Sequence, residues 1–128
     1  MEADIIVLSI PHSGTRALCK HLKTDVHTHF NGKPVKLKSA HIPIRNPMDI
    51  AESWARRGKS LKELLQRFNE MFEVIQGKQT DTRLYKVEDI TPHAQDDEKH
   101  HAPLKVMYYR WMVKRRVFDQ WGIYKQWY

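Results

Sequence analysis

A short apolar run that ends abruptly in turn-forming residues constrains this chain most. Residues 5–10 are aliphatic apart from Ser9, residues 11–15 read Pro, His, Ser, Gly, Thr, and a helical pattern begins near Ala17. This order predicts a buried first strand, a tight turn and a helix over residues 13–22. Backbone N–H groups at such a turn face outward at a helix N-terminus, which favours phosphate or sulfate binding. An ordinary strand-to-helix turn is the alternative interpretation.

Length and composition narrow the class of protein. The 128 residues predict a single domain over residues 1–128. The net charge of +7 and the pI near 9.6 favour an anionic partner, such as a nucleotide, a sulfate ester, nucleic acid or an acidic membrane. No apolar run approaches the ~20 residues of a membrane span, and no leader precedes the first strand, so we expect a cytoplasmic protein. The single cysteine, Cys19, agrees with a reducing compartment and is expected to be a small buried apolar residue.

Strand and helix patterns alternate along the chain. Alternating or β-branched runs predict strands at 25–30, 40–44 and 82–87, although Pro43 indicates a strand end or an edge strand. Asn46 and Ser60 predict the starts of helices that end near residues 58 and 77, and another helix begins at Pro103. The alternation predicts an α/β fold with a small parallel β-sheet flanked by helices.

The C-terminal segment, residues 103–128, is basic, aromatic and expected to be helical. Its apolar residues at helical spacing predict one inward side, made of Leu104, Met107, Tyr108, Trp111 and Met112. Residues 121–128 have no clean period, and their aromatic rings predict a surface for a protein partner or a second copy. The mixture of rings and cations also permits binding of single-stranded nucleic acid, but packing of the rings on the sheet is the interpretation we favour.

Two segments fail as nucleotide-hydrolysis motifs. Residues 57–60 contain Gly-Lys-Ser, but Ser53 stands where a Walker A loop needs glycine, and a helix precedes the segment. The loop at residues 11–15 lacks the lysine and the magnesium-binding hydroxyl of that motif, with Thr15 and Arg16 in their places. A triphosphatase is therefore not expected.

Three segments, in order within about the first 90 residues, together resemble sulfotransferases that use 3′-phosphoadenosine 5′-phosphosulfate (PAPS). Residues 11–15 resemble the family's Pro-Lys/Arg-Ser-Gly-Thr loop for the 5′-phosphosulfate. Residues 45–49 with Ser53 resemble its Arg-Asn-Pro-x-Asp-x-x-x-Ser element for the 3′-phosphate, and residues 87–90 are similar to its Tyr-Glu-Asp-Leu segment. The resemblance implies a P-loop NTPase-like three-layer sandwich, and the short chain resembles bacterial or bacteriophage members.

The resemblance also implies an activity: transfer of a sulfuryl group from PAPS to a hydroxyl or amine acceptor, with no metal. The residues that it assigns to the donor are Pro11, His12, Ser13, Gly14, Thr15, Arg16, Arg45 and Ser53. Residues 28–30 resemble the Thr-His-Leu around the family's histidine base, so His29 is the first candidate base, followed by His27 and His41. Strand alternation puts His27 and His29 on one face. His12, where the family has a permanent cation, is a further catalytic candidate.

Departures from the family pattern support an alternative. Besides His12, Val87 replaces an aromatic residue, and no late Arg-Lys-Gly element follows. The alternative is a catalytically inactive module of the same fold that binds a phosphoadenosine nucleotide, a nucleic acid or a host protein. A metal site is not expected, because no histidine pair has ligand spacing with a suitable third ligand.

Overall fold

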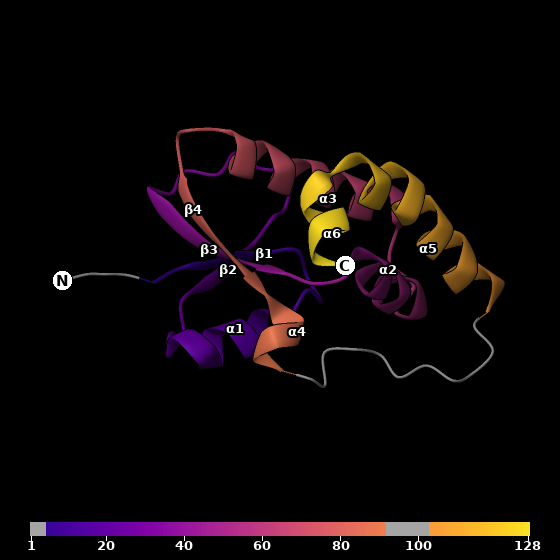
Figure 1. Cartoon of the computed structure of the whole chain (residues 1–128), viewed down its shortest axis with the longest axis horizontal. Helices are drawn as coiled ribbons and strands as arrows, with labels where there is room; N and C mark the ends of the chain where they lie inside the picture. The colour runs from indigo at the N-terminus through magenta and orange to yellow at the C-terminus, as the bar shows by residue number, and fades with distance from the viewer. Residues whose placement is uncertain (1–4, 92–102) are drawn as a thin grey trace.

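Four parallel strands in the order β2-β1-β3-β4 form the centre of this α/β fold (Figure 1). The computed structural model describes residues 5–91 and 103–128. The strands are β1 (Val7–Ser9), β2 (His27–His29), β3 (Ser39–Ile44) and β4 (Asp81–Lys86). Each falls on a segment that the sequence pattern predicts as a strand, so the predicted parallel sheet is confirmed.

Helices lie on both sides of this sheet. The helices are α1 (Thr15–Leu22), α2 (Pro47–Arg56), α3 (Leu61–Gln76), α4 (Val87–Ile90), α5 (Leu104–Arg116), the 3₁₀ turn η2 (Phe118–Gln120) and α6 (Gly122–Trp127). In Figure 1, α1 and α4 lie on one side, and α2, α3, α5 and α6 lie on the other. The strand order accounts for this arrangement: β1 leads to β2 in one direction across the sheet and β3 leads to β4 in the other, so connections of the usual right-handed sense place α1 and α2 on opposite faces. No helix in the described ranges is long and apolar enough to cross a membrane.

The start signals read from the sequence are confirmed. The side chain of Asn46 accepts a hydrogen bond from the N–H of Met48 at 3.1 Å, and the hydroxyl of Ser60 accepts one from the N–H of Glu63 at 3.2 Å. Pro43 is the next-to-last residue of β3, as expected of a proline near a strand end, and the alternative of an edge strand is wrong because β3 lies between β1 and β4.

Alternation along β3 explains why proline is tolerated there. The N–H of His41 donates to the carbonyl oxygen of Ile6 at 2.9 Å, so residues 41 and 43 direct their backbone groups toward β1. The pairing of β1 with β3 is centred on Val7 and His41. Pro43 follows that pairing, so its missing N–H ends the ladder with β1 rather than breaking it in the middle.

The two faces of the sheet differ in character. Leu8, Ile10, Ile42 and Ile44 join the large core under α2, α3, α5 and α6. On the α1 side the buried apolar residues are Val7, Leu18 and Val87, and polar groups such as Ser9, His41 and Tyr85 share that side. The α1 side thus carries the polar groups of the sheet.

The predicted inward side of the last helix is wrong. The residues that α5 buries are Val106, Tyr109 and Val113, whereas Leu104 is 81 % exposed and Met107, Tyr108 and Trp111 are each about half exposed. The helix has apolar residues on two sides, and polar partners decide which side packs. The hydroxyl of Tyr109 donates to the carbonyl oxygen of Lys59 at 2.6 Å, and Arg110 contacts Asp49 and Glu52 of α2.

Aromatic residues of the C-terminal segment pack against the core, with Tyr124 buried and Trp121, Trp127 and Tyr128 partly buried, and the partner surface expected there stays a prediction. Tyr124 is only 1 % exposed, and its ring meets that of Phe68 edge to face with centroids 6.4 Å apart. The rings of Trp121 and Phe72 are 4.1 Å apart. The irregular spacing arises because η2 turns the chain before α6, so no single helical period applies.

Candidate functional site

The strand order reverses beside β1, and the predicted anion loop lies at that point. Strands β1 and β3 are adjacent, but their following helices cover opposite faces, which opens a crevice at their carboxyl ends. A cavity of about 790 Å³ lies there, and its lining residues are Pro11, His12, Gly14, Thr15, Arg16, Ala17, His27, His29, Arg45, Ser53 and Arg57. Nine residues of the predicted site therefore line one cavity.

Hydrogen bonds from behind the loop hold its backbone. The carbonyl oxygens of residues 10, 11 and 12 accept bonds from the hydroxyl of Ser13 at 2.5 Å, Nε1 of Trp54 at 2.8 Å and Nη1 of Arg45 at 2.9 Å. Three successive carbonyls are thereby occupied by protein donors. The negative ends of these peptide dipoles are satisfied inside the protein, so the loop favours an anion rather than a cation.

Gly14 joins the loop to α1 in a conformation that other residues rarely adopt. Its φ angle is +99°, and a Cβ placed on it would lie 2.7 Å from a γ-methyl of Val87. The first N–H groups of α1 have no partner within the helix, no side chain caps them, and the first turn has no acidic residue. Gly14 thus lets the helix start open toward the cavity.

His12 is a neutral group in this setting. Burial lowers the pKa of His12 to about 4, and the positive charges of Arg57, Lys59 and Arg45 contribute to the same shift. At neutral pH its imidazole does not supply the positive charge that a lysine or arginine supplies there.

Arginines supply the positive charge of the cavity. Arg16 comes from α1, Arg45 follows β3, and Arg57 follows α2. The described residues that line this cavity include no aspartate or glutamate. Ser53, one turn before Arg57 on the same helix side, adds a hydroxyl. The arrangement suits a ligand with negative charge at more than one point.

A chain of side-chain contacts connects the loop with His29. The hydroxyls of Thr15 and Ser9 are 2.7 Å apart, and the Ser9 hydroxyl lies 3.1 Å from Nδ1 of His29. The rings of His27 and His29 are 5.8 Å apart, and both line the cavity, as strand alternation predicts. If His29 Nδ1–H donates to Ser9, then Nε2 is left as the basic nitrogen.

Two predicted site residues do not line the cavity. The hydroxyl and the N–H of Ser13 both donate to the carbonyl oxygen of Ile10, so this serine stabilises the loop from within. His41 lies away from the cavity lining, and its Nδ1 is 2.7 Å from the hydroxyl of Tyr85. Cys19, expected to be buried, is partly exposed at a neighbouring cavity.

Sequence reasoning missed four residues that organise the site. Ser9 has a recognisable signal, a single hydroxyl inside an aliphatic strand, and it is fully buried. Arg57 and Trp54 have no such signal, because only the packing of α2 brings them to the loop. Tyr128 donates to Glu88 at 2.7 Å, while the other carboxylate oxygen of Glu88 accepts the N–H of Asn46 at 2.9 Å.

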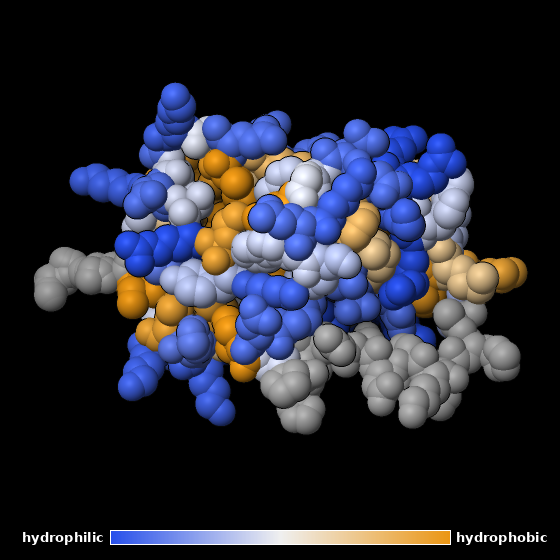
Figure 2. Space-filling view, viewed as in Figure 1, coloured by the Kyte–Doolittle hydropathy of each residue, from blue (hydrophilic) through white to orange (hydrophobic). Residues whose placement is uncertain are grey.

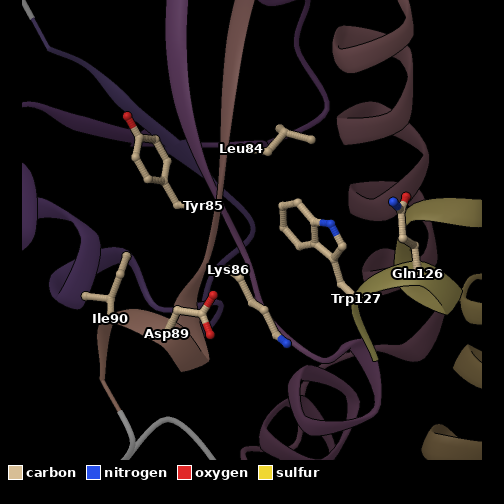
Figure 3. Close-up of a pocket in the computed structure, with 7 residues that line it drawn as sticks. All are labelled: Leu84, Tyr85, Lys86, Asp89, Ile90, Gln126 and Trp127. Carbon is tan, nitrogen blue, oxygen red and sulfur yellow. The ribbon is translucent and has the colours of Figure 1, made fainter.

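A separate cavity of about 580 Å³ lies beside β4, at the edge of the sheet (Figure 3). In Figure 3, Tyr85 and Ile90 lie on one side of β4 and Trp127 lies on the other. None of the residues assigned from sequence to the donor or to catalysis lines this cavity. The cavity beside β1, in contrast, combines the loop, the arginines and the histidines.

Comparisons with models of known protein families, with curated proteins and with solved structures give no match for this chain.

Proposed function

We propose that the cavity beside β1 binds a 3′-phosphoadenosine nucleotide and that the protein is a small PAPS-dependent sulfotransferase. The observation that carries the proposal is the convergence of two anion anchors on one cavity. The loop at residues 11–16 provides helix N–H groups, and Arg45 with Ser53 provides a second cluster from β3 and α2. A ligand with phosphate groups at both ends would use both anchors.

The proposed fold type is a three-layer sandwich like that of P-loop NTPases. The helices on both sides of a parallel sheet support it, as does the loop between β1 and α1. The loop departs from an NTPase loop where a lysine and a magnesium-binding hydroxyl would follow glycine. Sulfuryl transfer needs neither, so this departure favours it over triphosphate hydrolysis.

In the proposed reaction, the acceptor oxygen or nitrogen forms a bond to sulfur, and the sulfur–oxygen bond to the 5′-phosphate breaks. The bridging oxygen keeps that electron pair, and the nucleotide product is 3′-phosphoadenosine 5′-phosphate. His29 accepts the acceptor's proton at Nε2, while Nδ1–H donates to Ser9. Ser9 in turn donates to Thr15, which leaves the Thr15 hydroxyl proton for an anion in the loop.

Arg57 and Arg16 take the place of the loop lysine in this proposal. Both line the cavity together with His12, and both carry guanidinium groups that can form paired hydrogen bonds with phosphate or sulfate oxygens. A dianion beside His12 would also favour its protonated form, so nucleotide binding and proton uptake by His12 are coupled. The charge on the breaking oxygen is then shared between arginine and a histidine that becomes protonated on binding.

Calorimetric titration with 3′-phosphoadenosine 5′-phosphate tests the binding proposal. We expect Arg45→Gln to weaken this ligand by about tenfold or more, because a charge-assisted hydrogen bond to phosphate is lost. Adenosine 5′-phosphate, which lacks the 3′ group, should lose less affinity, namely only the part that comes from the lost bond between Arg45 and the His12 carbonyl of the loop. Arg83→Gln, an exposed change on β4, is the matched control. No binding by the folded wild-type protein at millimolar nucleotide would end the proposal.

A second test separates binding from transfer. His29→Asn should abolish sulfuryl transfer to a panel of phenols, alcohols and amines, while nucleotide affinity stays close to that of the wild type. His41→Asn is the control, because His41 contacts Tyr85 outside the cavity lining. Nucleotide binding without transfer by the wild type would favour the inactive binding module.

We also infer a second candidate function, binding of single-stranded nucleic acid by α5. Tyr108 and Trp111 are exposed and stacked with centroids 6.4 Å apart, and the guanidinium of Arg115 lies 4.9 Å from the Trp111 ring centre. Figure 2 shows apolar surface at the right edge, over the start of this helix. The helix carries five cations and no acid, which complements a phosphate backbone.

Quenching of tryptophan fluorescence by an oligodeoxythymidine tests this candidate. Trp111→Ala and Arg115→Gln should weaken binding, and the affinity should fall as salt rises. Lys62→Gln, an exposed change on α3, should have little effect. An affinity that Trp111→Ala leaves unchanged would refute the candidate without affecting the nucleotide site.

A further inference from the structure

A second cavity of about 610 Å³ adjoins the nucleotide cavity on the α1 side of the sheet. Its lining residues are Thr15, Arg16, Cys19, Lys20, Lys23, Thr24, Asp25 and His27. Three of these, Thr15, Arg16 and His27, also line the cavity that contains the loop. The two cavities are therefore neighbours across a shared wall of three side chains.

The shared wall places the second cavity next to the proposed reaction centre. Thr15 belongs to the first turn of α1, where the 5′ end of the nucleotide is proposed to bind. The His27 ring is 5.8 Å from the ring of His29, the proposed base. Nδ1 of His27 lies 3.3 Å from the carbonyl oxygen of Asp25, which orients the imidazole at the boundary. A small molecule in the second cavity would present its hydroxyl toward this boundary.

The charges of the second cavity are unequal. Arg16, Lys20 and Lys23 contribute three cations, and Asp25 is the one carboxylate among the described lining residues. The rest of the lining is the thiol of Cys19, two threonines and the imidazole of His27. Lys20 and Lys23, from the last turn of α1 and its C-cap, lie at the end away from Thr15. A cavity with a cationic end and a largely uncharged middle suits a small ligand with one anionic group.

We propose that this second cavity is the acceptor site and that it selects hydroxyl compounds that carry a carboxylate or another anionic group. The inference rests on the proposed sulfotransferase function. The anionic group of the acceptor binds near Lys20 and Lys23, and its body lies along Cys19. Its hydroxyl reaches the boundary near Thr15 and His27, beside the sulfuryl donor.

Alkylation of Cys19 tests the cationic character of the cavity in the unmodified protein. Burial and the charge of Asp25 raise the pKa of the Cys19 thiol, so absolute rates would mix ionisation with electrostatics. The ratio of the iodoacetate rate to the iodoacetamide rate cancels the thiolate fraction. We expect this ratio to exceed that of N-acetylcysteine by about threefold or more at low salt, since a potential of ~1 kT has that effect. The double substitution Lys20→Gln, Lys23→Gln should bring the ratio back toward the value for N-acetylcysteine.

Protection of the same thiol tests acceptor selection. Para-hydroxyphenylacetate should slow iodoacetamide labelling of Cys19 and should be sulfated in preference to its neutral amide, para-hydroxyphenylacetamide, by about tenfold. The doubly substituted Lys20→Gln, Lys23→Gln protein should lose this preference and keep its affinity for 3′-phosphoadenosine 5′-phosphate. Lys36→Gln with Lys38→Gln, two exposed changes outside both cavities, is the matched control.

The outcomes separate the two proposals. Suppose that the protein binds the nucleotide but its alkylation ratio is no higher than that of N-acetylcysteine, or that it sulfates para-hydroxyphenylacetate and para-hydroxyphenylacetamide equally. Either result overturns the acceptor site and leaves the nucleotide site standing. An absence of nucleotide binding overturns the sulfotransferase proposal and the acceptor role with it. A high ratio together with preferential sulfation of the acid supports both.

Discussion

Replacing Gly14 by alanine tests the close approach that holds the anion loop in place. The new Cβ would lie 2.7 and 2.8 Å from the two γ-methyl groups of Val87, well inside van der Waals contact. The φ angle of +99° adds backbone strain, because an L-residue rarely adopts it. Strain of about 1–2 kcal/mol and overpacking of about 1–3 kcal/mol together predict a loss of roughly 2–5 kcal/mol.

The chain offers a matched control for the backbone part of this loss. Gly58 also has a positive φ angle, +71°, but a Cβ there would meet nothing within 4 Å. Gly58→Ala should therefore cost only the strain of about 1–2 kcal/mol. Urea titrations give the free energy of unfolding of each variant, and the losses for Gly14→Ala and Gly58→Ala are compared provided that the dependence on urea concentration (the m-value) is the same for all proteins.

A double-mutant cycle isolates the steric part. Val87→Ala removes both methyl groups that a Cβ at Gly14 would meet, so the double variant should lose less stability than the sum of the single variants. Strict additivity, or a Gly14→Ala loss no larger than that of Gly58→Ala, would refute the steric reasoning. Gly14→Ala should also weaken nucleotide binding, because the start of α1 shifts.

Three further outcomes follow from contacts around the site. The pKa of His12 in the folded protein is about 4, below its ordinary value of 6.5. Between these two values the unfolded chain binds a proton at His12 that the folded protein does not. The unfolding free energy therefore rises with pH across this window, and the contribution of His12 is fully present above it. The expected gain is about 1 kcal/mol after discounting for partial exposure, and His12→Asn should flatten the profile of unfolding free energy between pH 4.5 and 7. Trp54→Phe should cost about 1–3 kcal/mol and weaken nucleotide binding, since the carbonyl of Pro11 loses its buried donor, whereas unchanged calorimetry would contradict that role. Tyr128→Phe should lower the unfolding free energy by about 1–2 kcal/mol through loss of its bond to Glu88, and an unchanged urea midpoint would show that the contact is not stabilising.

Local signals predicted much of this molecule, because they depend on short-range physics. The caps at Asn46 and Ser60 each act within three residues, and both helices begin where the sequence indicates. Strand alternation placed His27 and His29 on one face for the same reason. The α/β pattern then determined the parallel sheet, since alternating strands and helices bury their apolar sides in few ways.

The helix packing of the C-terminal segment was not predictable in this way. Both sides of α5 carry apolar residues, so the spacing alone selects neither. The choice depends on Tyr109 and Arg110 finding partners in Lys59, just after α2, and in Glu52 of α2, which lie 50 and 58 residues earlier in the chain. Burial of Tyr124 similarly depends on a turn at η2 that brings its ring against Phe68.

The sequence by itself determined where the loop at residues 11–16, its following helix and the second basic element around Arg45 occur along the chain. Only the tertiary structure decided that Arg45 and the loop meet at one cavity, because the pairing of β3 with β1 is a property of the whole sheet. It also decided the charge of the cavity. Burial and neighbouring cations leave His12 neutral, while the packing of α2 brings Arg57 to the same place, and neither effect is encoded in a local pattern.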